Sequence, residues 1–147
     1  MSEYLDASIV VKWFKQNEPN HKESIQLLDR IKTFEDDFVM SEYGLLELVR
    51  GLVKENFPEQ TIESAFEMVK DLYETNALLK VPVEDVLYLA KDIEIKLNLY
   101  ASDALHLASA IQHGCKIFWS EDKHFFKVKV TDYLSKFNME ARTLVNI

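Results

Sequence analysis

Short apolar runs and longer segments with helical periodicity follow one another along this chain. The short runs at residues 3–5, 37–40, 78–83 and 116–119, and a last one near 143–145, predict β-strands. Apolar side chains spaced three or four positions apart predict helices at residues 9–14, 20–34, 41–56, from Pro58 onward, 86–97, 102–112 and 121–126. This alternation favours an α/β fold in which a mostly parallel sheet of four to five short strands lies between two layers of helices.

Composition supports one compact domain spanning residues 1–147. Apolar residues make up 48% of the chain, with 3 glycines and 3 prolines, which leaves little material for linkers. No apolar run is long enough to span a membrane, and the first residues lack the pattern of a signal peptide. The single cysteine, Cys115, indicates a buried thiol and a reducing compartment, so we expect a cytoplasmic protein.

A formal net charge of −8 bears on any role in nucleic-acid binding. Proteins that grip phosphate backbones usually present many basic side chains. A nucleic-acid site here would therefore use a local basic patch, and part of the acidic excess would be offset if several acids bind a metal ion.

Three aspartates lie where a strand or loop leads into a helix: Asp6, Asp103 and Asp122. Taken singly, Asp6 has the ordinary explanation of a helix cap, Asp103 that of an acid at a helix N-terminus, and Asp122 that of a turn residue. The carboxyl ends of parallel strands meet at one edge of a sheet, however, so these acids could also meet there. A cluster of carboxylates repels itself unless a cation lies within it.

Glu47 differs because it lies inside a largely apolar helix. It could be exposed and paired with Arg50, three residues further along, or it could face a site. Gly51, one turn below, costs the helix about 1 kcal/mol relative to alanine, which suggests that another group approaches closely there.

Other constellations are weaker. The four histidines lack zinc-ligand spacing, and His106 is interpreted as a packed residue or one that supports a ligand. No glycine-rich phosphate-binding loop is present.

Together the four acids and their flanking residues resemble the PIN domain, particularly the VapC-like toxins. The matching motifs are Tyr4-Leu5-Asp6-Ala7-Ser8, Ser41 with Glu47 in Leu45–Leu52, Asp103-Ala104-Leu105-His106-Leu107-Ala108-Ser109-Ala110, and Ser120-Glu121-Asp122-Lys123-His124-Phe125. Their order and separations match the family from end to end. Ala7 departs from the hydroxyl residue common at that position, and Glu121 offers a second carboxylate beside Asp122.

The resemblance implies a metal-dependent ribonuclease with a PIN-like three-layer fold. Asp6, Glu47, Asp103 and Asp122 would hold Mg²⁺ or Mn²⁺ and carry out catalysis, and Ser8 and Ser120 would fix the orientation of ligands or phosphate. Lys12, Lys54, Lys123 and His124 are the expected RNA contacts. A small antitoxin protein and a homodimer are the partners that the resemblance implies.

Four alternative functions are compatible with the same residues. The chain could be a catalytically silent PIN-like scaffold that binds RNA or protein, or a housekeeping RNA-processing nuclease. It could also be a metal-dependent phosphatase or a structure-specific DNA nuclease, although no insertion for threading DNA is visible.

Overall fold

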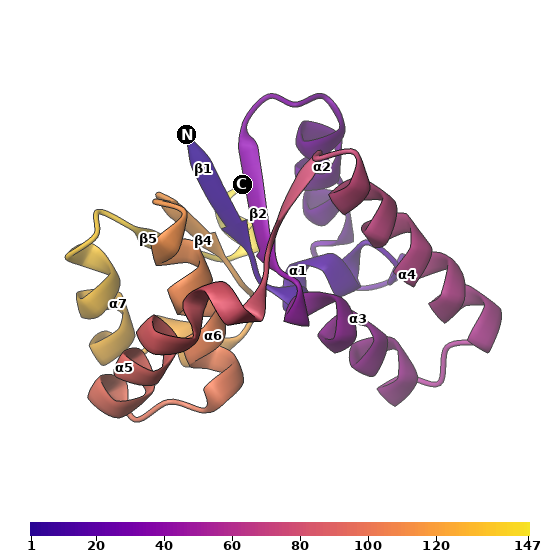
Figure 1. Ribbon diagram of the computed structural model, residues 1–147. Helices are drawn as coiled ribbons and strands as arrows, with labels where there is room; N and C mark the ends of the chain where they lie inside the picture. Colours follow the sequence, from indigo (N-terminus) through magenta and orange to yellow (C-terminus); the bar gives the residue numbers. More distant parts are fainter.

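The structure, a computed structural model that describes residues 1–147, is built on a five-stranded parallel sheet with strand order β3-β2-β1-β4-β5 (Figure 1). The strands are β1 (Ser2–Leu5), β2 (Asp37–Ser41), β3 (Leu78–Val81), β4 (Ile117–Trp119) and β5 (Glu140–Arg142). Each neighbouring pair is parallel. All five carboxyl ends therefore lie on one edge of the sheet, as the sequence predicted for the strands ending near Leu5, Met40 and Trp119.

Helices cover both faces of the sheet, which confirms the three-layer α/β prediction. One face carries α1 (Ala7–Lys12), α2 (His21–Lys32), α3 (Tyr43–Lys54) and α4 (Glu59–Glu74), and the other carries α5 (Leu87–Leu97), α6 (Ala101–Gln112) and α7 (Val128–Ser135) (Figure 1). Three short 3-10 helices, η1 (Val83–Val86), η2 (Lys123–Phe126) and η3 (Leu144–Asn146), complete the chain.

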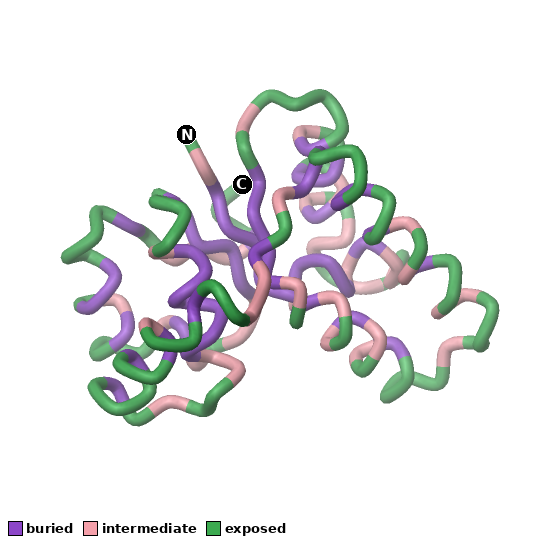
Figure 2. Tube along the Cα trace, viewed as in Figure 1, coloured by how far each residue is buried: buried purple, intermediate pink, exposed green.

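The central strands are buried on both faces because successive side chains point in opposite directions. The core on the α1–α4 side takes Leu5, Met40 and Trp119, and the core on the α5–α7 side takes Tyr4, Val39 and Phe118. Figure 2 shows the central strands coloured mostly as buried. This two-sided burial explains why the strands read as continuous apolar runs.

Two elements at the C-terminal end differ from the sequence prediction. Helix α7 was not predicted, and the last strand is Glu140–Arg142 rather than residues 143–145. Leu144 is fully buried, but it enters the core from η3 instead of from a strand. The apolar side chain of Leu144 thus indicates a contact with the core and does not indicate a strand.

A buried ion pair lies on the α1–α4 face of the sheet, near its amino-terminal edge. Glu3 in β1 is fully buried, and Arg30 of α2 and Nε1 of Trp119 (2.7 Å) donate hydrogen bonds to it. Arg30 also pairs with Asp36 at 2.7 Å. The charge of Glu3 is therefore compensated within the fold.

Cys115 is fully buried, as expected, and burial raises the pKa of its thiol to about 12. Among the helices of this structure, none has the length and apolar character needed to cross a membrane.

Candidate metal centre

A cavity of about 360 Å³ opens at the carboxyl edge of the sheet, and all four of the predicted acids line it. Asp6 directly follows β1, and Glu47 comes from the middle of α3. Asp103 lies in the first turn of α6, and Asp122 follows β4 at the start of η2. We call this cavity the acid pocket. The fold thus brings together carboxylates that are widely separated along the chain.

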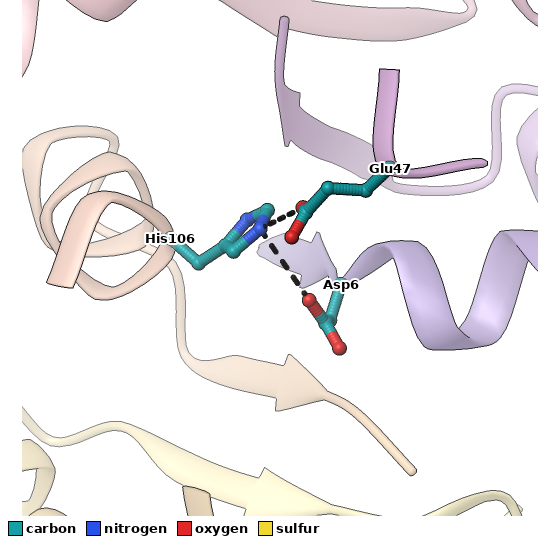
Figure 3. Close-up of side chains that lie close together, drawn as sticks. All are labelled: Asp6, Glu47 and His106. Carbon is teal, nitrogen blue, oxygen red and sulfur yellow. Dashed lines mark hydrogen bonds and ion pairs between the residues drawn. The ribbon is translucent and has the colours of Figure 1, made fainter. Parts of the chain in front are cut away.

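Asp6 occupies the residue before α1, but its side chain makes no capping hydrogen bond. Its Oδ2 instead accepts hydrogen bonds from Oγ of Ser8 (2.7 Å) and Oγ of Ser120 (2.9 Å). Oδ1 is the oxygen on the side of Glu47 and His106, 3.6 Å from Nε2 of His106 (Figure 3). The two serines therefore hold one oxygen of Asp6 and leave the other facing the cluster.

The same two hydroxyls also fix the loop after β4. Ser8 Oγ accepts the backbone N–H of Glu121, and Ser120 Oγ accepts that of Asp122, each at 2.9 Å. Because each hydroxyl donates to Asp6 while accepting from this loop, the positions of Asp6 and Asp122 are coupled.

Glu47 pairs with Nε2 of His106 from α6 and makes no ion pair with Arg50 (Figure 3). On the other side of the imidazole, Nδ1 lies 2.6 Å from the hydroxyl of Tyr4. That hydroxyl accepts the backbone N–H of Ser41 at 3.1 Å. Its proton is then available to Nδ1, so the neutral imidazole carries its own proton on Nε2 and donates it to Glu47.

Charge around the pocket shifts two pKa values. Burial opposes the charged form of His106, but the hydrogen bond to Glu47 and the charges of Asp6 and Glu47 leave its pKa raised. Burial and the nearby carboxylates of Asp122 and Asp6 raise the pKa of Asp103, although His124 opposes the shift. Whether His106 is neutral or protonated, Nε2 keeps a proton, so this atom supports Glu47 and has no lone pair for a metal.

The oxygen donors of the pocket fit a hard divalent cation. One ligand atom from each of Asp6, Glu47 and His106 lies within 4.8 Å of the others. With Nε2 of His106 occupied, the available ligands are carboxylate oxygens from Asp6 and Glu47, joined in the same pocket by Asp103 and Asp122. Carboxylate-only donor sets favour Mg²⁺ or Mn²⁺ over zinc.

Of the two adjacent acids after β4, Asp122 lines the pocket and Glu121 does not. Asp122 Oδ1 accepts the backbone N–H of His124 at 2.9 Å. Glu121 is engaged elsewhere, accepting the backbone N–H of Leu144 at 3.0 Å. The structure therefore assigns Glu121 to anchoring the C-terminal segment.

The basic residues predicted to contact RNA fall in different places. Lys54 lines the acid pocket, and His124 lines a neighbouring cavity that also includes Asp103. Lys12 is instead paired with Glu18 at 3.2 Å, and Lys123 is exposed and lines neither cavity.

Arg50 was missed as a pocket residue, although it lines the acid pocket beside Lys54. Its position one turn after Glu47 was the available signal in the sequence.

Gly51 also lines the pocket, but the group that approaches it closely belongs to this chain. A Cβ atom at Gly51 would lie 2.9 Å from Cγ2 of Val11 in α1. The glycine therefore permits α1 to pack against α3, which confirms the close approach expected from the sequence and identifies Val11 as the approaching group.

A family model of the PIN domain matches residues 4–130. The chain belongs to the PIN-domain family. No curated protein sequence gives a significant match. Among solved structures, this PIN domain is similar to VapBC2 from Rickettsia felis bound to a promoter DNA fragment, with a TM-score of 0.66 at 16% identity over 97% of this chain and 98% of that one.

Two further structures show the same fold. VapC20 of Mycobacterium tuberculosis, a toxin that cleaves the sarcin–ricin loop, has a TM-score of 0.66 at 13% identity over 84% of this chain and 92% of that one. FitAcB from Neisseria gonorrhoeae has a TM-score of 0.61 at 15% identity over 99% of each chain. This PIN domain thus has the same fold as these three structures.

Proposed function

We propose that this PIN domain is a metal-dependent endoribonuclease that hydrolyses RNA phosphodiesters and serves as the toxin of a toxin–antitoxin pair. The observation that carries the proposal is the acid pocket, where four carboxylates meet and the inward oxygen of Asp6 is left free by two serine hydrogen bonds. The four carboxylates repel one another, and this repulsion disfavours the folded state unless a cation binds between them.

Asp6, Glu47, Asp103 and Asp122 would hold Mg²⁺ or Mn²⁺. The ion would polarise the scissile phosphate and make an attacking water more acidic. Tyr4 and His106 keep Glu47 oriented through hydrogen bonds on both imidazole nitrogens, and Ser8 and Ser120 do the same for Asp6. One carboxylate of the pocket orients the water and accepts its proton.

RNA is the substrate that we propose for this pocket. Arg50 and Lys54 place two cations in a cavity that also holds the acids, so a phosphate backbone can be bound locally in spite of the net charge of −8. The structurally similar VapC20 is a toxin that cleaves the sarcin–ricin loop, which is consistent with this substrate. We place the activity in the cytoplasm, where a single reduced thiol is stable.

We further propose that an antitoxin and a second copy of this chain bind the apolar surface around Tyr43. Two grooves of about 460 and 440 Å³ share Tyr43 and Val83, and Leu46 and Leu87 beside them are 61% and 55% exposed. Exposed apolar surface of this extent is typical of protein interfaces. Light scattering of the purified chain tests the dimer, and copurification with the product of a neighbouring short gene tests the antitoxin.

Cleavage of a pool of structured and single-stranded RNAs tests the catalytic proposal. Wild type should cut with Mn²⁺ or Mg²⁺ and stop when a chelator is added. Asp103→Asn should abolish cutting, whereas Asp71→Asn, a neutralised exposed acid on α4, should cut like wild type. Equal cutting by wild type and Asp103→Asn would contradict the proposed site.

The silent-scaffold alternative gives a different result. A scaffold would bind RNA without cutting it and would show no saturable Mn²⁺ binding by calorimetry. Saturable binding that is lost in Asp103→Asn supports the nuclease even before its preferred RNA is found.

A further inference from the structure

A second cavity of about 340 Å³ lies directly beside the acid pocket. Asp103 lines both cavities, so the two share a wall. The second cavity is formed by the segment that leads into the first turn of α6 and by the stretch from η2 to the first turn of α7. Its lining residues include Tyr100, His124, Lys127 and Lys129. A ligand bound at the acid pocket can therefore extend into it without crossing the protein.

Two lysines give this cavity a positive wall. Lys127 and Lys129 are exposed, and neither takes part in an ion pair, whereas Lys12, Lys15, Lys70 and Lys91 do. Two free cations side by side in a chain of net charge −8 favour an anionic ligand.

An exposed aromatic ring completes the cavity. Tyr100 is 75% exposed, which leaves its ring available, and it meets the ring of His124 edge-on at a centroid distance of 6.5 Å and an angle of 89°. Exposed aromatic side chains next to basic ones are the elements with which proteins bind single-stranded nucleic acids, because every base offers a face for stacking.

We propose that this cavity is a nucleotide subsite for single-stranded RNA, in which Lys127 and Lys129 each bind a backbone phosphate and Tyr100 stacks on a base. The inference rests on the proposed function. It assigns this cavity to the part of the RNA strand that extends beyond the acid pocket. Arg50 and Lys54 lie in the acid pocket itself, so cations are present both there and in the adjoining cavity. A continuous nucleic-acid strand would contact the basic side chains of both cavities and stack a base on Tyr100. An acidic peptide would contact the basic side chains only.

Binding of a fluorescein-labelled single-stranded RNA of mixed sequence, followed by anisotropy, tests the subsite. The measurement uses the Asp6→Asn background with Mn²⁺, so that the RNA stays intact. Lys127→Ala/Lys129→Ala should weaken binding. It should also make the negative slope of log affinity against log salt shallower by about 1.4, which corresponds to two lost phosphate contacts on a single strand. The matched pair Lys22→Ala/Lys32→Ala, which removes two exposed lysines from α2, should leave the slope unchanged.

Tyr100 is tested separately. Tyr100→Ala should weaken binding about tenfold, and Tyr100→Phe, which keeps the ring, should bind like the background protein. In otherwise wild-type protein, the same substitutions should raise KM for RNA cleavage more than they lower kcat, since they remove binding outside the reacting centre.

The outcomes separate the two proposals. Salt slopes for the Lys127/Lys129 pair that equal those of the Lys22/Lys32 pair would overturn the subsite, whether or not the protein cleaves RNA. So would displacement of the RNA by poly-glutamate at equal charge concentration. RNA binding that depends on Lys127, Lys129 and Tyr100 in a protein that never cleaves would support the subsite and overturn the nuclease.

Discussion

Tyr4 and His106, 102 residues apart in the chain, are joined by a 2.6 Å hydrogen bond from the phenol hydroxyl to Nδ1 of the imidazole. Both side chains are buried, and the far nitrogen of the imidazole donates to Glu47 at the acid pocket. A residue of β1 thus determines which nitrogen of a residue in α6 faces a carboxylate on α3.

Tyr4→Phe should reduce metal affinity and cleavage about 10- to 100-fold, the usual cost of removing a group that orients a ligand. It should also cost about 1–3 kcal/mol of unfolding free energy, because the backbone N–H of Ser41 loses its acceptor. Calorimetric Mn²⁺ titration and cleavage rates measure the first effect, and urea unfolding measures the second.

Tyr73→Phe is the matched control for this prediction. Tyr73 is also buried, and its hydroxyl donates to the backbone oxygen of Ser41 at 3.1 Å without contacting His106. It should lose comparable stability but keep Mn²⁺ affinity within about twofold, far short of the loss expected for Tyr4→Phe. Equal losses of metal affinity in both variants would contradict the role assigned to Tyr4.

Asp103→Asn should make the metal-free protein more stable at neutral pH. The pKa of Asp103 is raised in the folded state, so ionising this group disfavours folding, and the penalty appears as pH rises above the ordinary aspartate value of about 4. Below that pH, wild type and variant should converge. Thermal unfolding from pH 3 to 8 in the presence of a chelator measures the difference.

Added metal should reverse this order. At a free Mn²⁺ concentration about 100 times the dissociation constant, wild type gains about 2.7 kcal/mol, and Asp103→Asn, which lacks a ligand, gains less. A variant that gains as much as wild type would show that Asp103 does not bind the ion.

Gly51→Ala should destabilise the protein although alanine is the better helix former. The added Cβ would lie 2.9 Å from Val11, and relieving such overpacking costs about 1–3 kcal/mol, against about 1 kcal/mol gained in helix propensity. Val11→Ala in the same chain should recover stability, giving a coupling energy of about 0.5–3 kcal/mol in a double-mutant cycle. Strictly additive losses in urea unfolding would argue against the proposed contact.

Arg30→Met should cost about 3–5 kcal/mol of unfolding free energy, because it leaves Glu3 buried and without its cation. Arg142→Met breaks a partly exposed pair with Glu140 and should cost below about 1 kcal/mol. Similar losses in chemical denaturation would mean that burial of Glu3 is not what makes the first pair important.

The sheet, its parallel direction and the carboxyl-edge placement of the acids followed from local pattern. Alternation of short apolar runs with helical periodicity is a property of nearby residues, and parallel strands then place their ends together. Helix α7 escaped this reasoning because Val128, Val130 and Thr131 are β-branched and favour strands locally. Burial of Tyr133 and Leu134 against the core outweighs that preference.

The contacts that orient the site residues were harder to predict from the sequence. His106 was noted as a packed or supporting residue, but its partners lie 59 and 102 positions away, beyond any spacing rule. The same holds for Gly51, where the sequence indicated a close approach but could not identify Val11 as the neighbour. Contacts made by the tertiary fold decided these points.

The central place of β1 in the sheet has a consequence for synthesis on the ribosome. Strand β1 is made first, yet one of its two sheet neighbours, β4, begins only at Ile117, and the acids that join Asp6 extend to Asp122. A nascent chain therefore carries an unfinished acid pocket until most of it has been translated. An activity that degrades RNA would in this way remain latent while its own message is still being read.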